Sequence, residues 1–114
     1  MTPGLLYLAA PYSHPCPALR EMRFHAINRA AGDLMRRGCL VFSPISHSHP
    51  IARDCRLDGD FGFWRDWCLT MLAQCDRVII LPLWGWRDSR GVRAEVEFAR
   101  SLGMVVEFYC PKIK

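Results

Sequence analysis

Short apolar runs alternate along the chain with longer segments of mixed character. The apolar runs cover residues 4–9, 39–43, 77–83 and 104–109, which is the length of strands buried on both faces of a sheet. Between them, residues 18–37, 61–75 and 89–102 repeat apolar positions at the spacing of an amphipathic helix. Gly38 and Gly103 follow two of these segments, and a glycine commonly ends a helix.

This alternation predicts parallel strands joined by right-handed helical crossovers. We expect one α/β domain over residues 1–114, with a doubly wound, mainly parallel sheet of four to five strands flanked by helices, as in flavodoxin-like and Rossmann-like folds. Residues 44–60 contain two prolines and many polar residues, and we expect an irregular loop there. Loops of that length often carry function.

Composition narrows the class of protein. The 114 residues are 51% apolar and 23% charged, and no apolar run approaches the roughly 18 residues of a membrane span. The first residues lack the basic start of a signal peptide, so we expect a soluble cytoplasmic protein without a membrane partner. The six cysteines include no C-x-x-C pair, which predicts buried free thiols.

The formal charge of +4 comes from dispersed arginines rather than from a basic block with interleaved aromatics. This pattern predicts a small anionic ligand and no nucleic-acid partner.

Ligands of open parallel α/β sheets bind outside the carboxyl ends of the strands. That rule selects residues 11–16, 43–49, 60–66 and 83–92. The ligand contacts expected from these stretches include Pro11, Tyr12, Ser13, His47, His49 and Trp86.

His47 and His49 alternate with Ser48, which would put both rings on one side of an extended segment. No ligand spacing adds a third group to this pair, so we predict no metal and read the rings as phosphate or base contacts, or as loop caps. Trp86, with Trp84, could stack on a base or form a subunit contact.

Glu95 gives the sharpest signal in the sequence. Val92, Val96 and Ala99 mark the core-facing side of the last predicted helix, and Glu95 falls on that side, whereas Glu97 points away. A core-facing carboxylate is costly unless it is hydrogen-bonded, so Glu95 is either a structural hub or a group placed for chemistry.

Residues 89–99, SRGVRAEVEFA, resemble the pattern S-x-G-[TV]-x-x-E-x-G-x-A of the nucleoside 2-deoxyribosyltransferase superfamily. Tyr7 in the first strand and the Cys75-Asp76 pair also fall where that superfamily has them, and the resemblance covers most of the chain. More narrowly, YLAAPYSHP, FSPISHSHPI and LPLWGW resemble the uncharacterised DUF1937 family, which has no established activity.

The superfamily resemblance implies that Glu95 is a nucleophile, which attacks the anomeric carbon of a deoxynucleoside or its 5′-monophosphate. It also implies that Tyr7 holds Glu95, although Tyr7 reads equally well as a packed strand aromatic. Ser89, Gly91 and Val92 would bind phosphate at the helix N-terminus, and Ser89 alternatively serves as a plain N-cap.

The superfamily also implies an acid that contacts the base. Asp66 is the nearest candidate but is displaced by two positions, so Asp58 or Asp60 could serve instead. Glu97 replaces the glycine that the pattern has two residues after the nucleophile, and Asp76 begins a strand and reads as structural.

The sequence therefore predicts an N-glycosidase or deoxyribosyltransferase without a cofactor, which acts on a small nucleoside or nucleotide and forms a homo-oligomer. One alternative is a nucleotide-binding module without turnover. Another is a metal-dependent phosphate-ester hydrolase that uses His47, His49 and nearby aspartates.

Overall fold

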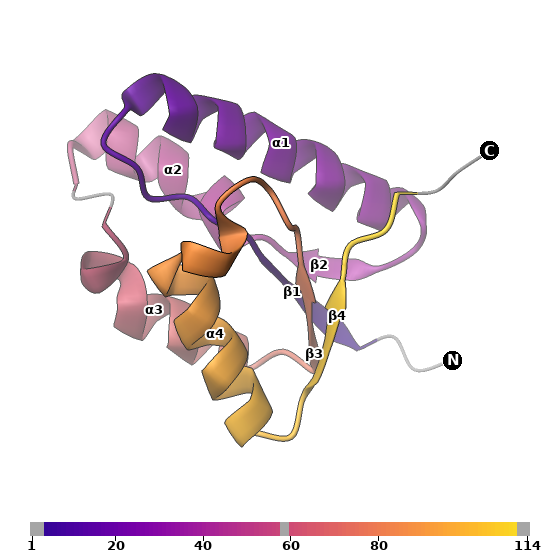
Figure 1. Cartoon of the computed structure of the whole chain (residues 1–114). Helices are drawn as coiled ribbons and strands as arrows, with labels where there is room; N and C mark the ends of the chain where they lie inside the picture. Colours follow the sequence, from indigo (N-terminus) through magenta and orange to yellow (C-terminus); the bar gives the residue numbers. More distant parts are fainter. Residues whose placement is uncertain (1–3, 58–59, 112–114) are drawn as a thin grey trace.

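Four parallel strands in the order β2-β1-β3-β4 form the centre of the molecule (Figure 1). The computed structural model describes residues 4–57 and 60–111. Its strands are β1 (Leu5–Ala9), β2 (Leu40–Phe42), β3 (Arg77–Ile80) and β4 (Val105–Phe108). The predicted parallel α/β architecture is confirmed, with four strands.

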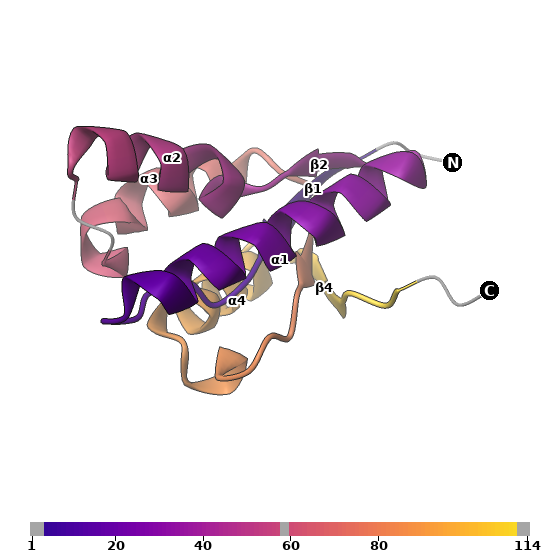
Figure 2. The same cartoon turned by 90° about the horizontal axis from the view of Figure 1, so that it is seen from above.

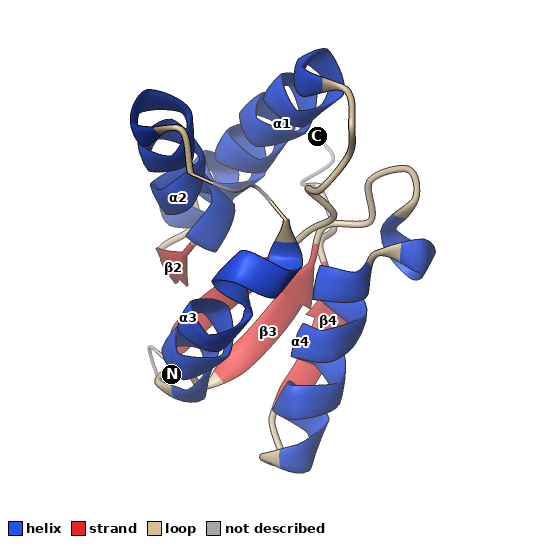
Figure 3. Cartoon of the chain, turned by 90° about the vertical axis from the view of Figure 1, so that its left-hand side faces the viewer, coloured by secondary structure: helices blue, strands red, loops and turns tan. Residues whose placement is uncertain are grey.

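Helices cover both faces of this sheet (Figure 3). α1 (Pro17–Arg36) lies on one face, and α3 (Phe61–Ala73) and α4 (Arg90–Ser101) lie side by side on the other. Each face has its own buried apolar cluster. The sheet is therefore doubly wound, as the sequence predicts.

Strand β1 alternates its side chains between these two clusters. Leu6 and Leu8 pack with Ile27 and Leu34 of α1, whereas Tyr7 and Ala9 belong to the cluster on the other face. Alternation of side chains along a strand explains this division. It also aims the Tyr7 side chain toward α3 and α4.

The segment predicted as a loop is largely a helix, and that prediction was wrong. α2 (Pro44–Cys55) begins after the N-cap residue Ser43 with Pro44 in its first turn, where a missing N–H loses no helical hydrogen bond. Pro50 does interrupt the helical bonding, but buried His49 and Ala52 anchor α2, which packs along α1 (Figure 2). Tertiary packing overrides the local proline signal.

The helical form of α2 also changes the placement of its histidines. Residues two positions apart on a helix point about 200° apart. His47 is accordingly exposed and His49 buried, rather than both rings lying on one side.

Two smaller predictions need adjustment. β3 ends at Ile80, before the predicted end near Pro82, although the Leu81 N–H still donates to the Ala9 carbonyl at 2.8 Å. All six cysteines are free, but only Cys68 and Cys75 are buried, so the prediction of buried thiols fails for Cys16, Cys55 and Cys110. Among the described helices, none has the length and apolar character needed to cross a membrane.

The connections that follow β1 and β3 leave these neighbouring strands in opposite directions, which opens a crevice at their carboxyl ends. Arg23 of α1, itself 8% exposed, spans this crevice. Its guanidinium donates to the carbonyls of Tyr12, Ser13 and Trp84, each at 3.2 Å. Arg23 thus ties the loop after β1 to the loop after β3.

Gly85 allows the second of these loops to turn close to Arg23. It has a φ of +86°, in the left-handed region that favours glycine. A Cβ there would lie in ordinary contact with Arg23 Nη2 at 3.4 Å, so a larger residue is disfavoured by the strained backbone and not by crowding.

Ile27 tests how much the α1 face contributes to stability. The side chain is fully buried, so Ile27→Ala should lower the free energy of unfolding by about 2–5 kcal/mol through lost apolar contact and a residual cavity. Urea unfolding measures this loss. The control Met22→Ala, on the same helix but 67% exposed, should cost under about 1 kcal/mol; equal losses would contradict the assigned core.

Candidate functional site

A cavity of about 260 Å³ opens at the carboxyl ends of the strands. One wall comes from the loop after β1 and from α2, and the other from α3, the β3–α4 loop and the start of α4. The lining residues that carry polar or aromatic groups are Tyr12, Ser13, Ser48, His49, Asp60, Phe61, Trp64, Cys68, Asp88, Ser89, Arg90 and Glu95. All four stretches selected from the sequence contribute to it.

Glu95 lies at the inner end of this cavity. It shares the core-facing side of α4 with Val92 and Ala99, and its side chain is 5% exposed. The Tyr7 hydroxyl donates to Glu95 Oε2 from the central strand. The structure therefore brings together the two residues that the sequence predicted to act as a pair.

Burial controls the protonation of Glu95. Loss of hydration raises the pKa of the carboxyl to about 8, and the hydrogen bond from Tyr7 opposes that shift without cancelling it. Burial also raises the pKa of Cys68 to about 12, with the nearby Glu95 adding to the effect. The carboxyl is thus mostly protonated at neutral pH, and the ionised form dominates above about pH 8.

The N-terminus of α4 forms the rim next to Glu95. Ser89 is its N-cap, and Ser89 Oγ accepts a hydrogen bond from the Val92 N–H at 3.2 Å. The Val92 side chain is 2% exposed and belongs to the core, so Val92 contributes to the site only through this cap. An anion at this end would meet the positive end of the helix dipole and the Arg90 side chain, which lines the cavity.

Gly91 has a packing role that the sequence did not reveal. A Cβ at this position would lie 3.1 Å from Cδ1 of Phe61, tighter than ordinary contact. The glycine therefore lets the first turns of α3 and α4 approach each other at the cavity, where both Gly91 and Phe61 are lining residues.

The aspartate near the start of α3 that lines the cavity is Asp60 and not Asp66. Asp66 is 98% exposed beside Arg65 and does not line the cavity. Asp60 does line it, and as the N-cap of α3 it accepts a hydrogen bond from the Gly62 N–H at 3.0 Å. Asp58 lies outside the described residues.

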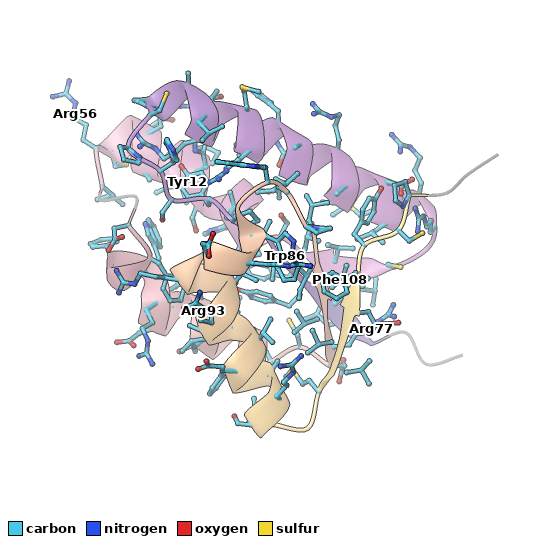
Figure 4. The ribbon with its side chains drawn as sticks, viewed as in Figure 1. Tyr12, Arg56, Arg77, Trp86, Arg93 and Phe108 are labelled. Atoms are coloured by element: carbon cyan, nitrogen blue, oxygen red, sulfur yellow. The ribbon has the colours of Figure 1, made fainter. Side chains whose placement is uncertain are left out.

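The remaining predicted contacts divide into two groups. Tyr12, Ser13 and His49 line the cavity. Pro11 is buried next to Tyr12 without lining it, and His47 is exposed and stacks on Trp67 with ring centroids 5.0 Å apart. Trp86 packs edge-on against Phe108 at 5.2 Å, away from Tyr12 (Figure 4).

His49 uses both of its ring nitrogens for internal contacts. Nδ1 contacts the Tyr12 hydroxyl, and Nε2 lies 2.7 Å from Oε1 of Glu21. Within residues 4–57 and 60–111, no three histidine, cysteine, aspartate or glutamate side chains come together as a metal site requires. The proposed pairing of His47 with His49 as metal ligands is not formed, because the two rings lie on different sides of α2.

Sequence reasoning missed several lining residues. Asp88 and Arg90 flank Ser89 inside the selected stretch 83–92, so the sequence indicated that they lie near the cavity. It did not assign a role to their charges. Trp64 and Cys68 lie in the segment 61–75, whose helical spacing of apolar positions gave no sign that these side chains reach the cavity. Glu97 is exposed on α4, as predicted. Asp76 pairs with Leu5 at the opposite end of the sheet, which fits its structural interpretation.

The fold and the cavity define a doubly wound α/β domain with a buried carboxyl group at the edge of its sheet where the strands have their carboxyl ends. The chain belongs to the DUF1937 family, described as a domain of unknown function, whose family model matches residues 4–110. No curated protein sequence matches the chain.

Tyr7→Phe tests the electrostatics of the buried pair. The Tyr7 hydrogen bond lowers the pKa of Glu95, so its removal should raise that pKa further above about 8. Carboxyl ¹³C NMR titration follows the Glu95 signal directly. The control Tyr109→Phe removes a hydroxyl that bonds Asp33 instead and should leave Glu95 unchanged. A lowered or unchanged pKa in Tyr7→Phe would contradict the assigned contact.

Proposed function

We propose that this protein cleaves the N-glycosidic bond of a nucleoside, or of its 5′-monophosphate, with Glu95 as the nucleophile. The observation that carries this proposal is the buried carboxyl of Glu95, held by Tyr7 and facing a ligand-sized cavity. The family resemblance seen in residues 89–99 points to the same residue.

The reaction suits the electrostatics around Glu95. Breaking the glycosidic bond develops positive charge on the sugar, and a carboxylate in a low-dielectric site attracts that charge more strongly than it would in water. The Glu95 carboxylate can then bond the anomeric carbon, and water or a second base can release the sugar. The Tyr7 hydrogen bond fixes the orientation of Glu95 and stabilises the leaving carboxylate in the second step.

The other lining residues match the parts of a nucleoside. Tyr12, Phe61 and Trp64 offer aromatic surface for a base. Asp60 and Asp88 can accept hydrogen bonds from sugar hydroxyls or from amino groups of the base. A 5′-phosphate would lie near Ser89 and Arg90 at the N-terminus of α4. Cytoplasmic location and homo-oligomer formation stay predictions.

A second candidate function is a nucleotide-binding module without turnover. It is favoured by the raised pKa of Glu95, which keeps the carboxyl largely protonated at neutral pH, and by the absence of Asp66 from the cavity lining. Such a module would bind the same ligands but would leave the glycosidic bond intact.

Glu95→Gln separates these functions. The wild-type protein, incubated with deoxynucleosides and their 5′-monophosphates, should release free base, measured by chromatography. Because the nucleophile must be ionised, the rate on a substrate whose base leaves without a proton should rise with pH through about 8. Glu95→Gln keeps the side-chain size and should lower base release by roughly 10⁴-fold or more.

The matched control is Glu97→Gln, which makes the same change on the exposed side of α4 and should keep wild-type activity. Ligand-induced thermal stabilisation without base release by the wild type would support the binding module and overturn the enzyme. On a substrate whose base leaves without a proton, a rate that falls as pH rises through about 8 would contradict the assignment of Glu95 as the nucleophile.

Asp88→Asn tests the choice between nucleoside and monophosphate. Asp88 precedes the N-cap of α4, so its charge should oppose a phosphate bound at that helix end. Its removal should raise kcat/KM for the monophosphate relative to the nucleoside by about five-fold, which corresponds to ~1 kcal/mol of repulsion near the surface. The control Asp54→Asn, 71% exposed and outside the lining, should not change this ratio.

A further inference from the structure

A hydrogen-bonded series of titratable side chains, here called the Tyr12 relay, reaches the cavity from the wall opposite Glu95. It joins Tyr12 in the loop after β1, His49 of α2 and Glu21 of α1. Tyr12 and His49 both line the cavity, whereas Glu21 does not and stands behind His49. The nucleophilic step leaves these three groups without a role.

The contacts among Tyr12, His49 and Glu21 determine which of their atoms carry protons. The hydrogen bond from His49 lowers the pKa of Glu21, so this carboxyl is ionised at neutral pH and can only accept. His49 Nε2, at 2.7 Å from Glu21 Oε1, therefore carries a proton. In a neutral ring Nδ1 is then the acceptor for the Tyr12 hydroxyl, and in a protonated ring Nδ1 donates to Tyr12 Oη.

The imidazole is held rigidly and shielded from solvent. His49 is 7% exposed, and the Phe24 ring stacks on it with centroids 4.2 Å apart. Other titratable or charged groups lie beside these three residues: His25 and Arg53 lie 3.2 Å and 3.9 Å from Glu21 Oε2, and Arg20 lies near the Tyr12 phenol. A carboxylate that orients a buried histidine, which in turn contacts a hydroxyl group, is the arrangement that moves protons in hydrolytic triads.

We propose that Tyr12 is the acid and base that exchanges a proton with the departing nucleobase, with His49 and Glu21 as positioning residues that supply and recover that proton. This role rests on the proposed function, because it needs a bond whose cleavage requires a proton. Tyr12 meets the ligand inside the cavity, and His49 and Glu21 act through it.

The proton moves twice in one catalytic cycle. In the first step Glu95 bonds the anomeric carbon, the C–N bond breaks, and the electrons of that bond go to the base nitrogen. The base nitrogen takes the proton of the Tyr12 hydroxyl. Tyr12 in turn receives the proton from Nδ1 of His49. In the second step water bonds the same carbon and the bond to Glu95 breaks, returning its electrons to the carboxylate. The water proton passes to Tyr12, and the Tyr12 proton returns to His49, whose positive charge Glu21 balances.

The test compares two leaving groups in single-turnover base release by Tyr12→Phe. A neutral purine such as that of 2′-deoxyguanosine needs a proton to leave, whereas the cationic base of 7-methyl-2′-deoxyguanosine leaves without one. The variant should lose roughly 10²–10⁴-fold on the first substrate and less than about three-fold on the second. Glu21→Gln should lower the rate on the first substrate and move its pH profile, because the imidazolium loses its countercharge.

Two control variants isolate the relay. Tyr109→Phe removes a hydrogen-bonded hydroxyl outside the cavity lining, and His25→Gln removes the other histidine that contacts Glu21; both should keep wild-type rates on both substrates. Equal losses on both substrates in Tyr12→Phe would show a structural role and overturn the relay alone. No loss on either would do the same, whereas no base release by the wild type would overturn the proposed function together with the relay.

Discussion

The hydrogen bond between Tyr7 and Glu95 connects the central strand to α4 and governs the chemistry of the cavity. A buried carboxyl needs a partner, and the partner here is a neutral hydroxyl instead of a cation. Tyr7 therefore satisfies the geometry of the carboxyl without fully offsetting the loss of hydration, and the pKa of Glu95 stays near 8. A cation in the same place would have lowered the pKa of Glu95 and kept its carboxyl ionised at neutral pH.

The parts of this arrangement that depend on periodicity could be predicted from the sequence. Strand alternation places Tyr7 on the face that α4 covers, and helical spacing places Glu95 on the side of α4 that meets it. The rule for carboxyl ends of parallel strands selected the segments that line the cavity, because it depends only on the order of strands and helices. The fold and the walls thus followed from local patterns, whereas the pairing of Tyr7 with Glu95 was implied only by the superfamily resemblance.

What the sequence could not provide depends on contacts between distant segments. The prolines of α2 favoured a loop, and only burial of His49 and Ala52 explains the helix. Asp60 lies at the N-terminus of α3, and Asp66 lies further along the same helix. Asp66 is displaced by two positions from the superfamily pattern, so the sequence could not decide which of the two aspartates faces the cavity. Glu21 lies 28 residues before His49, on the helix α1, which was predicted from its apolar positions alone. No local sequence pattern therefore indicated that the two side chains meet.

The Arg23 clamp gives the cavity a framework that does not respond to acidity. It holds two loops through three backbone carbonyls, which do not titrate, and although burial lowers the pKa of Arg23, a guanidinium stays charged throughout the range in which proteins remain folded. A change of pH that alters the charge of Glu95, or of Tyr12, His49 and Glu21, therefore leaves the hydrogen bonds from Arg23 to the two loops intact. Changes of rate with pH in this protein should therefore report proton occupancy on its side chains, without a contribution from opening of these two loops.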